Sequence, residues 1–534
     1  MASLESLPDE VLKLVMQHIP LVERLTSCCL VSRRLHAAAV AATEQLEILG
    51  KSDHPIKVER AESILGWLSH YGQHVTSLNF SIFEKPLQQL PCPNLLELKL
   101  GWCSVQLGPT ADGTPGVIQG CTKLTHLKLF CDIVDSPEGD VVDSLSSLVH
   151  LQQLTVMPLD LVNKRFYSTG GLSAATLPRL RHLTELWFRE LSVDNLAQLG
   201  DVPLRALDLK ACGNITVGPS SVPGLVFPES LTSLRLMSPV DGKVLALLPV
   251  GLQDLQLSRV VDSPDSFLSG VGRLQQLTCL DSSSWFGERW PALGPAYSAL
   301  TASSKLVSLK LWGDAPAEVW AHVFPVTRKL PHLTYLCADS AYTEHIWPPS
   351  AWGLTDLCSL VSCCPNVRTI ERMSLHPGLH VSELHKLTAL SRFELYCYTT
   401  DREGAAASLR GLAAVTQLLV LNCMFFRVAV SKAALLPLTS LTALTSLEIT
   451  SASDVEGETD DDEEDGEHGG AEVLRLKLVQ VSHGHTRSWT APSIRQLRVP
   501  LLAATRRKAA ATMYSTHMLA RLRVCLFEGL EVAW

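Results

Sequence analysis

The sequence predicts an α/β protein in which one short unit is repeated many times along the chain. The apolar pattern L-x-x-L-x-L recurs over most of the sequence, and 18 copies start about 26 residues apart on average. That spacing falls in the range of roughly 20–29 residues for leucine-rich repeats. With 534 residues, of which 46% are hydrophobic, the chain is too long for one compact core and has enough apolar side chains for an extended one.

Each copy predicts one β-strand. In Leu204–Leu207–Leu209 the last two leucines are two residues apart, so on a strand they share one face, and the residue between them lies on the other. One unit cannot bury its apolar face alone, so neighbours must stack into a solenoid. Clear copies start at Leu95, Leu124, Leu183, Leu204, Leu231, Leu252 and Leu306, and weaker ones at Val75, Leu151, Leu277, Leu333, Val367, Leu390, Val415, Leu444, Val473, Ile494 and Leu519.

The segments between strands are expected to return along the convex side of a horseshoe, with the parallel sheet on its concave side. Pro137–Leu148 and Gly353–Cys364 have the 3–4 spacing of apolar residues that predicts helices. The copies resemble the cysteine-containing subclass of leucine-rich repeats, with Cys103, Cys212 and Cys423 assigned to one slot after the strand. The fifteen cysteines include no CxxC pair, which predicts reduced, mostly buried thiols.

Charge excludes one class of partner. The net charge is −9, but Asp454–Glu467 holds ten carboxylates, so the remainder is close to neutral and lacks the basic face that nucleic acids require. Residues 451–471 are therefore predicted to be a disordered acidic insert, either a solvated loop or a docking strip for a basic partner.

No membrane partner is expected. The apolar stretch Gly411–Phe426 has 16 residues, fewer than the roughly 20 of a membrane span. Glu5, Asp9 and Glu10 lie where a signal peptide would be basic. We expect a cytoplasmic protein, with the nucleus as a second possible location.

The first forty residues predict a small helical module. Pro8 suits a first helical turn, and a helical stripe of apolar residues follows it, with further helices expected over Val22–Val31 and Ser32–Ala41. Leu7–Pro8–x–Glu10–Val11–Leu12, Ile19–Pro20–Leu21 and Val31–Ser32–Arg33–Arg34 occur in the order found in the F-box, which this segment resembles. The alternative is a simple amino-terminal cap for the solenoid.

The resemblance implies the substrate receptor of an SCF-type ubiquitin ligase, which is not itself an enzyme. Its F-box docks on a Skp-type adaptor that is joined to a cullin scaffold, and its repeats hold a protein substrate. The expected organisation is an F-box at 1–45, a connector or cap at 46–72, repeats at 73–450, the acidic insert and carboxyl-terminal repeats with a cap at 472–534. The candidate adaptor-binding residues are Leu7, Pro8, Val11, Leu12, Val15, Met16, Ile19, Leu21 and Val31.

Motifs for catalysis or cofactor binding are missing from the sequence. There is no phosphate loop, dinucleotide fingerprint, Gly-x-Ser-x-Gly or His-Glu-x-x-His. Cys358, Cys363, His376 and His380 have zinc-finger spacing, but Pro377–Gly378 interrupts the helix that both histidines would need. We therefore expect no metal and no cofactor.

The residues flanking the inner leucines predict where a substrate would bind. Tryptophan, tyrosine and arginine dominate binding hot spots, and they recur at these positions. The hypothesis centres on Trp187–Arg189 and Trp312–Tyr335; the alternative is a leucine-rich scaffold of the cytoskeleton or axoneme without a ligase role. The candidate substrate-binding residues are Lys128, Phe130, Trp187, Arg189, Arg235, Lys310, Trp312, Tyr335, Arg392 and Tyr396.

Overall fold

We analysed a computed structural model of the whole chain. The chain divides into two units, 1–481 and 482–534, and the second lies outside the described residues. The structure describes residues 7–19, 23–24, 31–49, 58–81, 87, 89–107, 116–133, 145–157, 177, 179–189, 197–210, 226–261, 264–286, 294–313, 319–339, 352–375, 381–398, 401–426, 428, 430–452 and 474–479.

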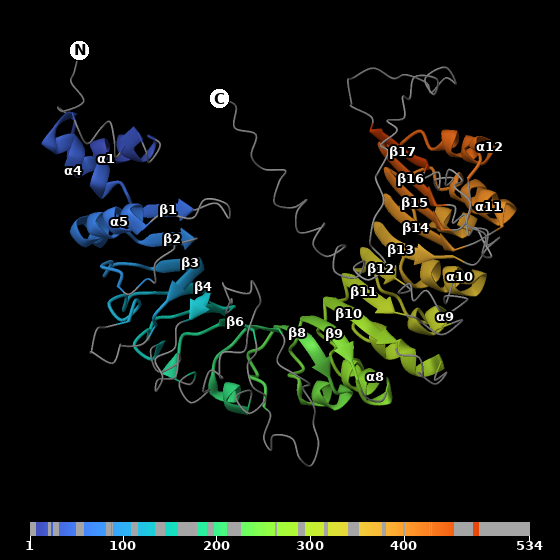
Figure 1. The fold of residues 1–534 in the computed structure, drawn as a ribbon. Helices are drawn as coiled ribbons and strands as arrows, with labels where there is room; N and C mark the ends of the chain where they lie inside the picture. Colours follow the sequence, from blue (N-terminus) through green and yellow to red (C-terminus); the bar gives the residue numbers. More distant parts are fainter. Residues whose placement is uncertain are drawn as a thin grey trace, which may run out of the picture. The chain divides into compact units, whose positions relative to one another are not determined.

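One open sheet runs through the first unit (Figure 1). Each strand from β1 to β16 pairs in parallel with the next one along the chain, as the repeat pattern predicts, for example β3 with β4 and β7 with β8. The strands are β1 Gln45–Leu49, β2 Ser77–Ser81, β3 Glu97–Val105, β4 His126–Ile133, β5 Gln153–Val156, β6 Glu185–Arg189, β7 Ala206–Lys210, β8 Ser233–Val240, β9 Asp254–Val260, β10 Cys279–Phe286, β11 Ser308–Gly313, β12 Tyr335–Asp339, β13 Thr369–Ser374, β14 Arg392–Tyr398, β15 Val420–Phe426, β16 Ser446–Ala452 and β17 Leu474–Val479.

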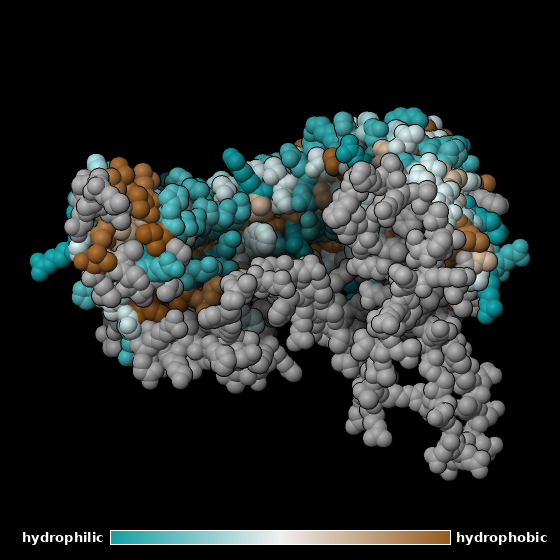
Figure 2. Space-filling view, turned by 90° about the horizontal axis from the view of Figure 1, so that it is seen from above, coloured by the Kyte–Doolittle hydropathy of each residue, from teal (hydrophilic) through white to brown (hydrophobic). Residues whose placement is uncertain are grey.

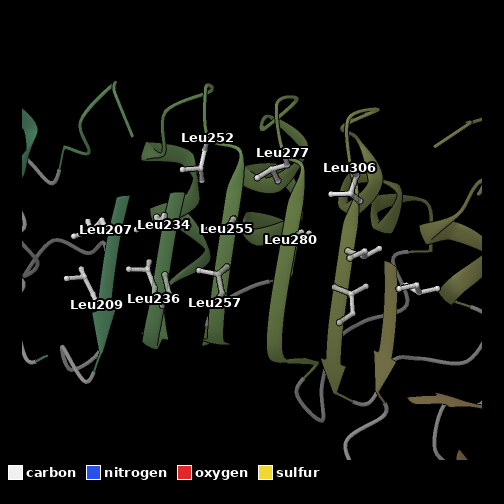
Figure 3. Close-up of a cluster of buried hydrophobic side chains, with 14 of the residues drawn as sticks. Leu207, Leu209, Leu234, Leu236, Leu252, Leu255, Leu257, Leu277, Leu280 and Leu306 are labelled. Atoms are coloured by element: carbon white, nitrogen blue, oxygen red, sulfur yellow. The ribbon is translucent and has the colours of Figure 1, made fainter. Parts of the chain in front are cut away.

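The inner leucines form continuous rows beneath this sheet (Figure 3). Leu207, Leu234 and Leu255 lie at equivalent positions on β7, β8 and β9, and the row continues through Leu280 on β10. All four are buried and belong to one apolar core that runs from the first strand to the last repeat. The core is therefore shared between neighbouring repeats, as expected for a solenoid.

The same backbone hydrogen bonds join each described repeat from β2 to β16 to the one before it. The backbone N–H groups of Thr125 and His126 both donate to the carbonyl oxygen of Leu96, at 2.8 and 3.0 Å, and the Thr125 hydroxyl donates to it as well, at 2.9 Å. This start-of-strand junction recurs with the threonine hydroxyls at positions 76, 184, 232, 278, 334 and 445. It satisfies the carbonyl at the start of each strand.

The return segments are short helices along one face of the sheet (Figure 1). The helix expected over Gly353–Cys364 is confirmed as α10, Leu354–Cys363, whereas most of Pro137–Leu148 lies outside the described residues. The other helices are α5 Val58–Tyr71, α8 Pro264–Gly272, α9 Val319–Val323, α11 Arg402–Leu412 and α12 Lys432–Leu435, with 3-10 turns at Gly72–His74, Ala197–Asp201, Gly242–Leu247, Gly294–Thr301, Val381–Lys386 and Leu436–Ser440. None of the described helices has the length and apolar character to cross a membrane.

The repeat array begins earlier in the chain than the expected boundary at residue 73. Strand β1 pairs in parallel with β2, and Ala61 and Leu68 of α5 are buried in the shared core. Residues 45–71 thus form a first repeat unit on the solenoid, where the sequence predicted a connector or cap. Its strand was missed because Gln45–Leu49 carries only one buried leucine, Leu46.

Two predicted repeat positions are wrong in register or direction. The copy placed at Val415 starts three residues later, at Leu418, so that Leu421 and Cys423 take the inner strand positions. Cys423 therefore replaces an inner leucine and does not share a slot with Cys103. The copy at Val473 forms β17, which pairs antiparallel with β16. Cys212, the copies at Ile494 and Leu519, and nearly all of the acidic insert lie outside the described residues.

Candidate protein-binding surfaces

The amino-terminal module has an apolar core of its own. Helices α1 (Asp9–Gln17) and α4 (Arg33–Ala41) pack together through buried Leu12, Met16 and Leu35. Three alanines of the α4 segment complete a cluster that is distinct from the core of the repeats. The third predicted helix is thereby confirmed, while most of the second, Val22–Val31, lies outside the described residues.

Polar contacts fix the two helices against each other. Arg34 donates to Asp9 Oδ1 from Nε at 3.0 Å and from Nη2 at 2.6 Å, and it also donates to the carbonyl oxygen of Leu7. The Ser32 hydroxyl accepts from the backbone N–H of Leu35 at 3.2 Å and caps α4. The module therefore has a defined packing around an apolar core of its own.

Exposed apolar side chains lie on the outside of this module. Leu14, Val31 and Val11 expose 58%, 70% and 40% of their surface. Figure 2 shows hydrophobic atoms at the surface at the end of the molecule that carries these helices. Large exposed apolar groups that gather on a small module mark an interaction surface.

The structure separates the predicted adaptor-binding residues into two groups. Pro8, Val11 and Val31 are exposed and available to a partner, whereas Leu12 and Met16 are buried and instead support the module from inside. Among the remaining predicted residues, Leu7, Val15 and Ile19 are half-buried, and Leu21 lies outside the described residues. Leu14 was missed, although its spacing of three from Val11 places both on one side of α1.

The second surface is the sheet face opposite the inner leucines, here called the polar face. Its central row consists of the residues between the two inner positions of each strand. In register along the chain, this row contains Asn79, Lys99, Lys128, Thr155, Trp187, Asp208, Arg235, Gln256, Asp281 and Lys310.

Charges in the middle of the central row neutralise each other. Arg235 pairs with Asp208 at 3.8 Å, and Lys310 pairs with Asp281 at 3.6 Å. Burial raises the pKa values of both aspartates, and the neighbouring cations lower them by less. Arg235 and Lys310, both predicted for substrate binding, are thus already committed to intramolecular ion pairs.

Five of the predicted substrate-binding residues lie near one another on β11–β14. Lys310 Nζ lies 5.4 Å from the centre of the Tyr335 ring, Tyr335 donates its hydroxyl to Glu371, and Arg392 Nε lies 3.4 Å from that carboxylate. Trp312 lies two residues after Lys310 on β11, and Tyr396 lies on the same face of β14 as Arg392. Burial and the hydrogen bond to Glu371 raise the pKa of Tyr335.

Arg372 was missed by the sequence analysis. Its guanidinium lies over the Trp312 ring, 4.5 Å from the ring centre, a cation–π contact. The strand register shifts between Ile370 and Met373, and Arg372 has φ 56°, which is rare outside glycine. This bulge turns the side chain toward Trp312, and the leucine spacing contains no signal for it.

Three of the other predicted residues meet at a hollow of about 100 Å³ over β4–β6. Lys128, Phe130 and Trp187 all line it, together with residues on β5 and the start of β6, namely Gln153, Leu154, Thr155 and Glu185. Trp187 exposes 43% of its surface. Lys128 and Phe130 on β4 and Trp187 on β6 therefore line one depression, while the side chain of Arg189 lies outside the described part of the chain.

The cysteines that the structure describes are free thiols, and most are buried. Burial raises the pKa of Cys103 to about 12, so its thiol stays protonated at neutral pH. Cys358 is exposed on α10, Cys363 is buried, and the two histidines of the zinc-like spacing lie outside the described residues. Among the described residues, no group of three or more metal-ligating side chains occurs.

Comparison with known families identifies the amino-terminal module. Residues 4–40 match the F-box domain. The chain is an F-box protein with leucine-rich repeats. The matched segment covers α1, all of α4 except its last residue, and the buried residues Leu12, Met16 and Leu35, and it ends shortly before β1. The repeats follow from the strand order and the rows of inner leucines described above.

Comparison with curated proteins found no match for this F-box protein. Solved structures of leucine-rich-repeat proteins align with it at low identity. An internalin of Listeria monocytogenes is 17% identical, with 73% of this chain and 94% of the other covered and a TM-score of 0.41. A leucine-rich-repeat protein of Leptospira interrogans is 15% identical, with 72% and 92% covered and a TM-score of 0.40.

Proposed function

We propose that this F-box protein is the substrate receptor of an SCF-type ubiquitin ligase. The F-box would dock on a Skp-type adaptor, which is joined to a cullin scaffold, and the polar face of the repeats would hold a protein substrate for ubiquitin-dependent degradation. A role in protein interaction follows directly from an F-box joined to a leucine-rich-repeat solenoid, and the ligase role is our further step.

One observation carries the proposal: the F-box has its own buried core and still exposes Val11, Leu14 and Val31. A simple solenoid cap would bury its apolar side chains against the first repeat. Here polar side chains of the F-box contact the repeats instead. His36 Nε2 hydrogen-bonds with the Tyr71 hydroxyl of α5 at 3.2 Å, and Lys13 Nζ forms an ion pair with Glu44 Oε1 at 2.8 Å. Apolar anchors on exposed helices suit docking on another protein.

In the proposed complex this chain contributes binding and positioning. It would hold a substrate near a ubiquitin-charged enzyme, which raises the effective concentration of the substrate lysine at the reacting thioester. The catalytic groups would belong to other subunits. We propose a cytoplasmic location, which immunofluorescence of the endogenous protein would test.

The test is co-purification of the full chain with a Skp-type adaptor after expression together. A stable one-to-one complex on gel filtration is expected, together with recovery of the cullin from cell extract. The double variant Val11→Asp/Leu14→Asp should elute alone, because a charge on each anchor would have to be desolvated at the interface. If the wild-type chain elutes without adaptor, the ligase proposal fails and the scaffold alternative stands.

A further inference from the structure

Two lysines in the central row of the polar face differ from every other cation of that row. Lys99 and Lys128 lie side by side on β3 and β4, in register, and both are exposed. Neither has an ion pair or hydrogen bond with any residue in the described part of the chain. By contrast, Arg235 and Lys310 each face an aspartate of the preceding strand.

Two acidic side chains near the lysines have other partners, and a third, Glu185, lines the hollow together with Lys128. Asn79 donates to Glu47 at 2.7 Å, and Ser77 donates to Glu97 at 3.2 Å. Like charges at directly opposed positions of neighbouring strands destabilise a sheet. An anionic group that binds between the two ammonium groups would relieve this repulsion, which gives the pair a preference for acidic ligands.

The hollow beside the two lysines favours a ligand that also carries an apolar side chain. Lys128 is part of its lining, and so are the next positions of the row, Thr155 and Trp187. Phe130 and the exposed Trp187 ring supply apolar surface. A large apolar side chain seated there would be covered by aromatic groups while an acidic neighbour reaches the lysines.

The strand spacing sets the distance between these two groups. Neighbouring strands are about 4.8 Å apart, so the point between Lys99 and Lys128 lies roughly 7 Å from the middle of the hollow over Thr155. Residues i and i+2 of an extended peptide lie on one side and are separated by about 7 Å. A peptide running along the row would therefore place the two side chains at positions i and i+2.

We propose that Lys99, Lys128 and the Phe130–Trp187 hollow form a subsite for an extended protein segment that carries an acidic side chain two residues from a large apolar one. The inference rests on the proposed use of the polar face for substrate binding. Nucleic acid does not fit the site, because two lysines are too few to neutralise a phosphate backbone.

The test is an array of synthetic nine-residue peptides of glycine and serine, each with one phenylalanine and one variable residue. The variable residue is glutamate, phosphoserine, glutamine or lysine, and zero to three residues separate it from the phenylalanine. Labelled full-length chain is expected to bind the glutamate or phosphoserine peptides with a one-residue spacer at least tenfold more strongly than the glutamine peptides. Binding to glutamate assigns a carboxylate ligand, and binding to phosphoserine alone assigns a phosphate.

The variant Lys99→Glu/Lys128→Glu should lose this preference at least tenfold. Its matched control is Lys123→Glu/Lys305→Glu, which changes the same charge at exposed lysines outside the strands. Both variants should keep the far-ultraviolet spectrum of the wild type and should still bind the adaptor. The subsite is overturned if neither the glutamate nor the phosphoserine peptides bind more strongly than the glutamine peptides, or if the two double variants have equal effects. If the wild type shows the peptide preference but does not bind the adaptor, the result would instead count against the proposed ligase role.

Discussion

The exposed leucine of α1 allows a quantitative test of the F-box surface. Leu14 leaves 58% of its surface exposed. Full burial of a leucine side chain contributes about 1.5–3 kcal/mol, so burial of the exposed part at an interface contributes about 0.9–1.7 kcal/mol. Leu14→Ala should therefore weaken adaptor binding by roughly 5- to 20-fold. Isothermal titration of the purified adaptor into the full chain measures this change.

Two controls separate a surface effect from loss of the fold. Leu354→Ala removes a leucine of similar exposure, 52%, on the repeat helix α10, and should leave adaptor binding unchanged. Leu12→Ala removes a fully buried leucine and should destabilise the module by about 2–5 kcal/mol. It would weaken adaptor binding through unfolding, which faster proteolysis of the amino-terminal segment would reveal.

Adaptor binding by Leu14→Ala within twofold of the wild type would contradict the assignment of this leucine to the interface. An equal loss of adaptor binding in Leu354→Ala and Leu14→Ala would contradict the same assignment. Either result would mean that the exposed side of α1 is not the part of the F-box that meets the adaptor.

Three further predictions concern the repeats. Leu255→Ala, at a fully buried row position, should lower the free energy of unfolding by about 2–5 kcal/mol in urea denaturation, whereas Gln256→Ala should change it by less than about 0.5 kcal/mol. Iodoacetamide should alkylate Cys358 in the native chain and spare Cys397, whose pKa burial raises to about 12, as peptide mass spectrometry would show; equal labelling would contradict the buried position. Burial raises the pKa of Asp208 in the folded state, so its ionised form costs stability above that pKa and the cost disappears below the unfolded value of about 3.9. Asp208→Asn should therefore be more stable than the wild type at pH 7, with the difference shrinking as the pH falls; a difference independent of pH would contradict this.

The leucine spacing predicted most of the fold because each inner leucine has one possible place. A shift of one residue would move Leu207 and Leu209 to the polar face, so the pattern determines both strand and register. Helix α10 and the F-box were predictable for a similar reason, since their apolar residues recur at helical spacing. The predicted register was wrong at Val415 because two starting points fit the pattern. Both Val415–Leu418 and Leu418–Leu421 are apolar pairs with the required spacing of three.

The candidate surfaces were less predictable because they depend on contacts between distant segments. The spacing of α1 allows two apolar sides, and only the packing of α4 decides that Leu12 is buried and Leu14 exposed. The contact between Arg372 and Trp312 depends on a bulge, and the antiparallel direction of β17 depends on a connection outside the described residues. Sequence analysis did identify Lys128, Phe130 and Trp187, but the hollow that unites them appears only when their strands pair.

Because of the junction at the start of each strand, the register of a strand does not depend on the number of residues in its repeat. The threonine hydroxyl and the carbonyl it meets are 25 residues apart at Thr278 and 32 apart at Thr184, yet both junctions set their strands in the same register. A return segment can therefore gain or lose several residues without moving the side chains of the polar face. Natural variation, or an affinity tag placed by an experimenter, is best tolerated in those segments, while the central row keeps its spacing of one strand per repeat.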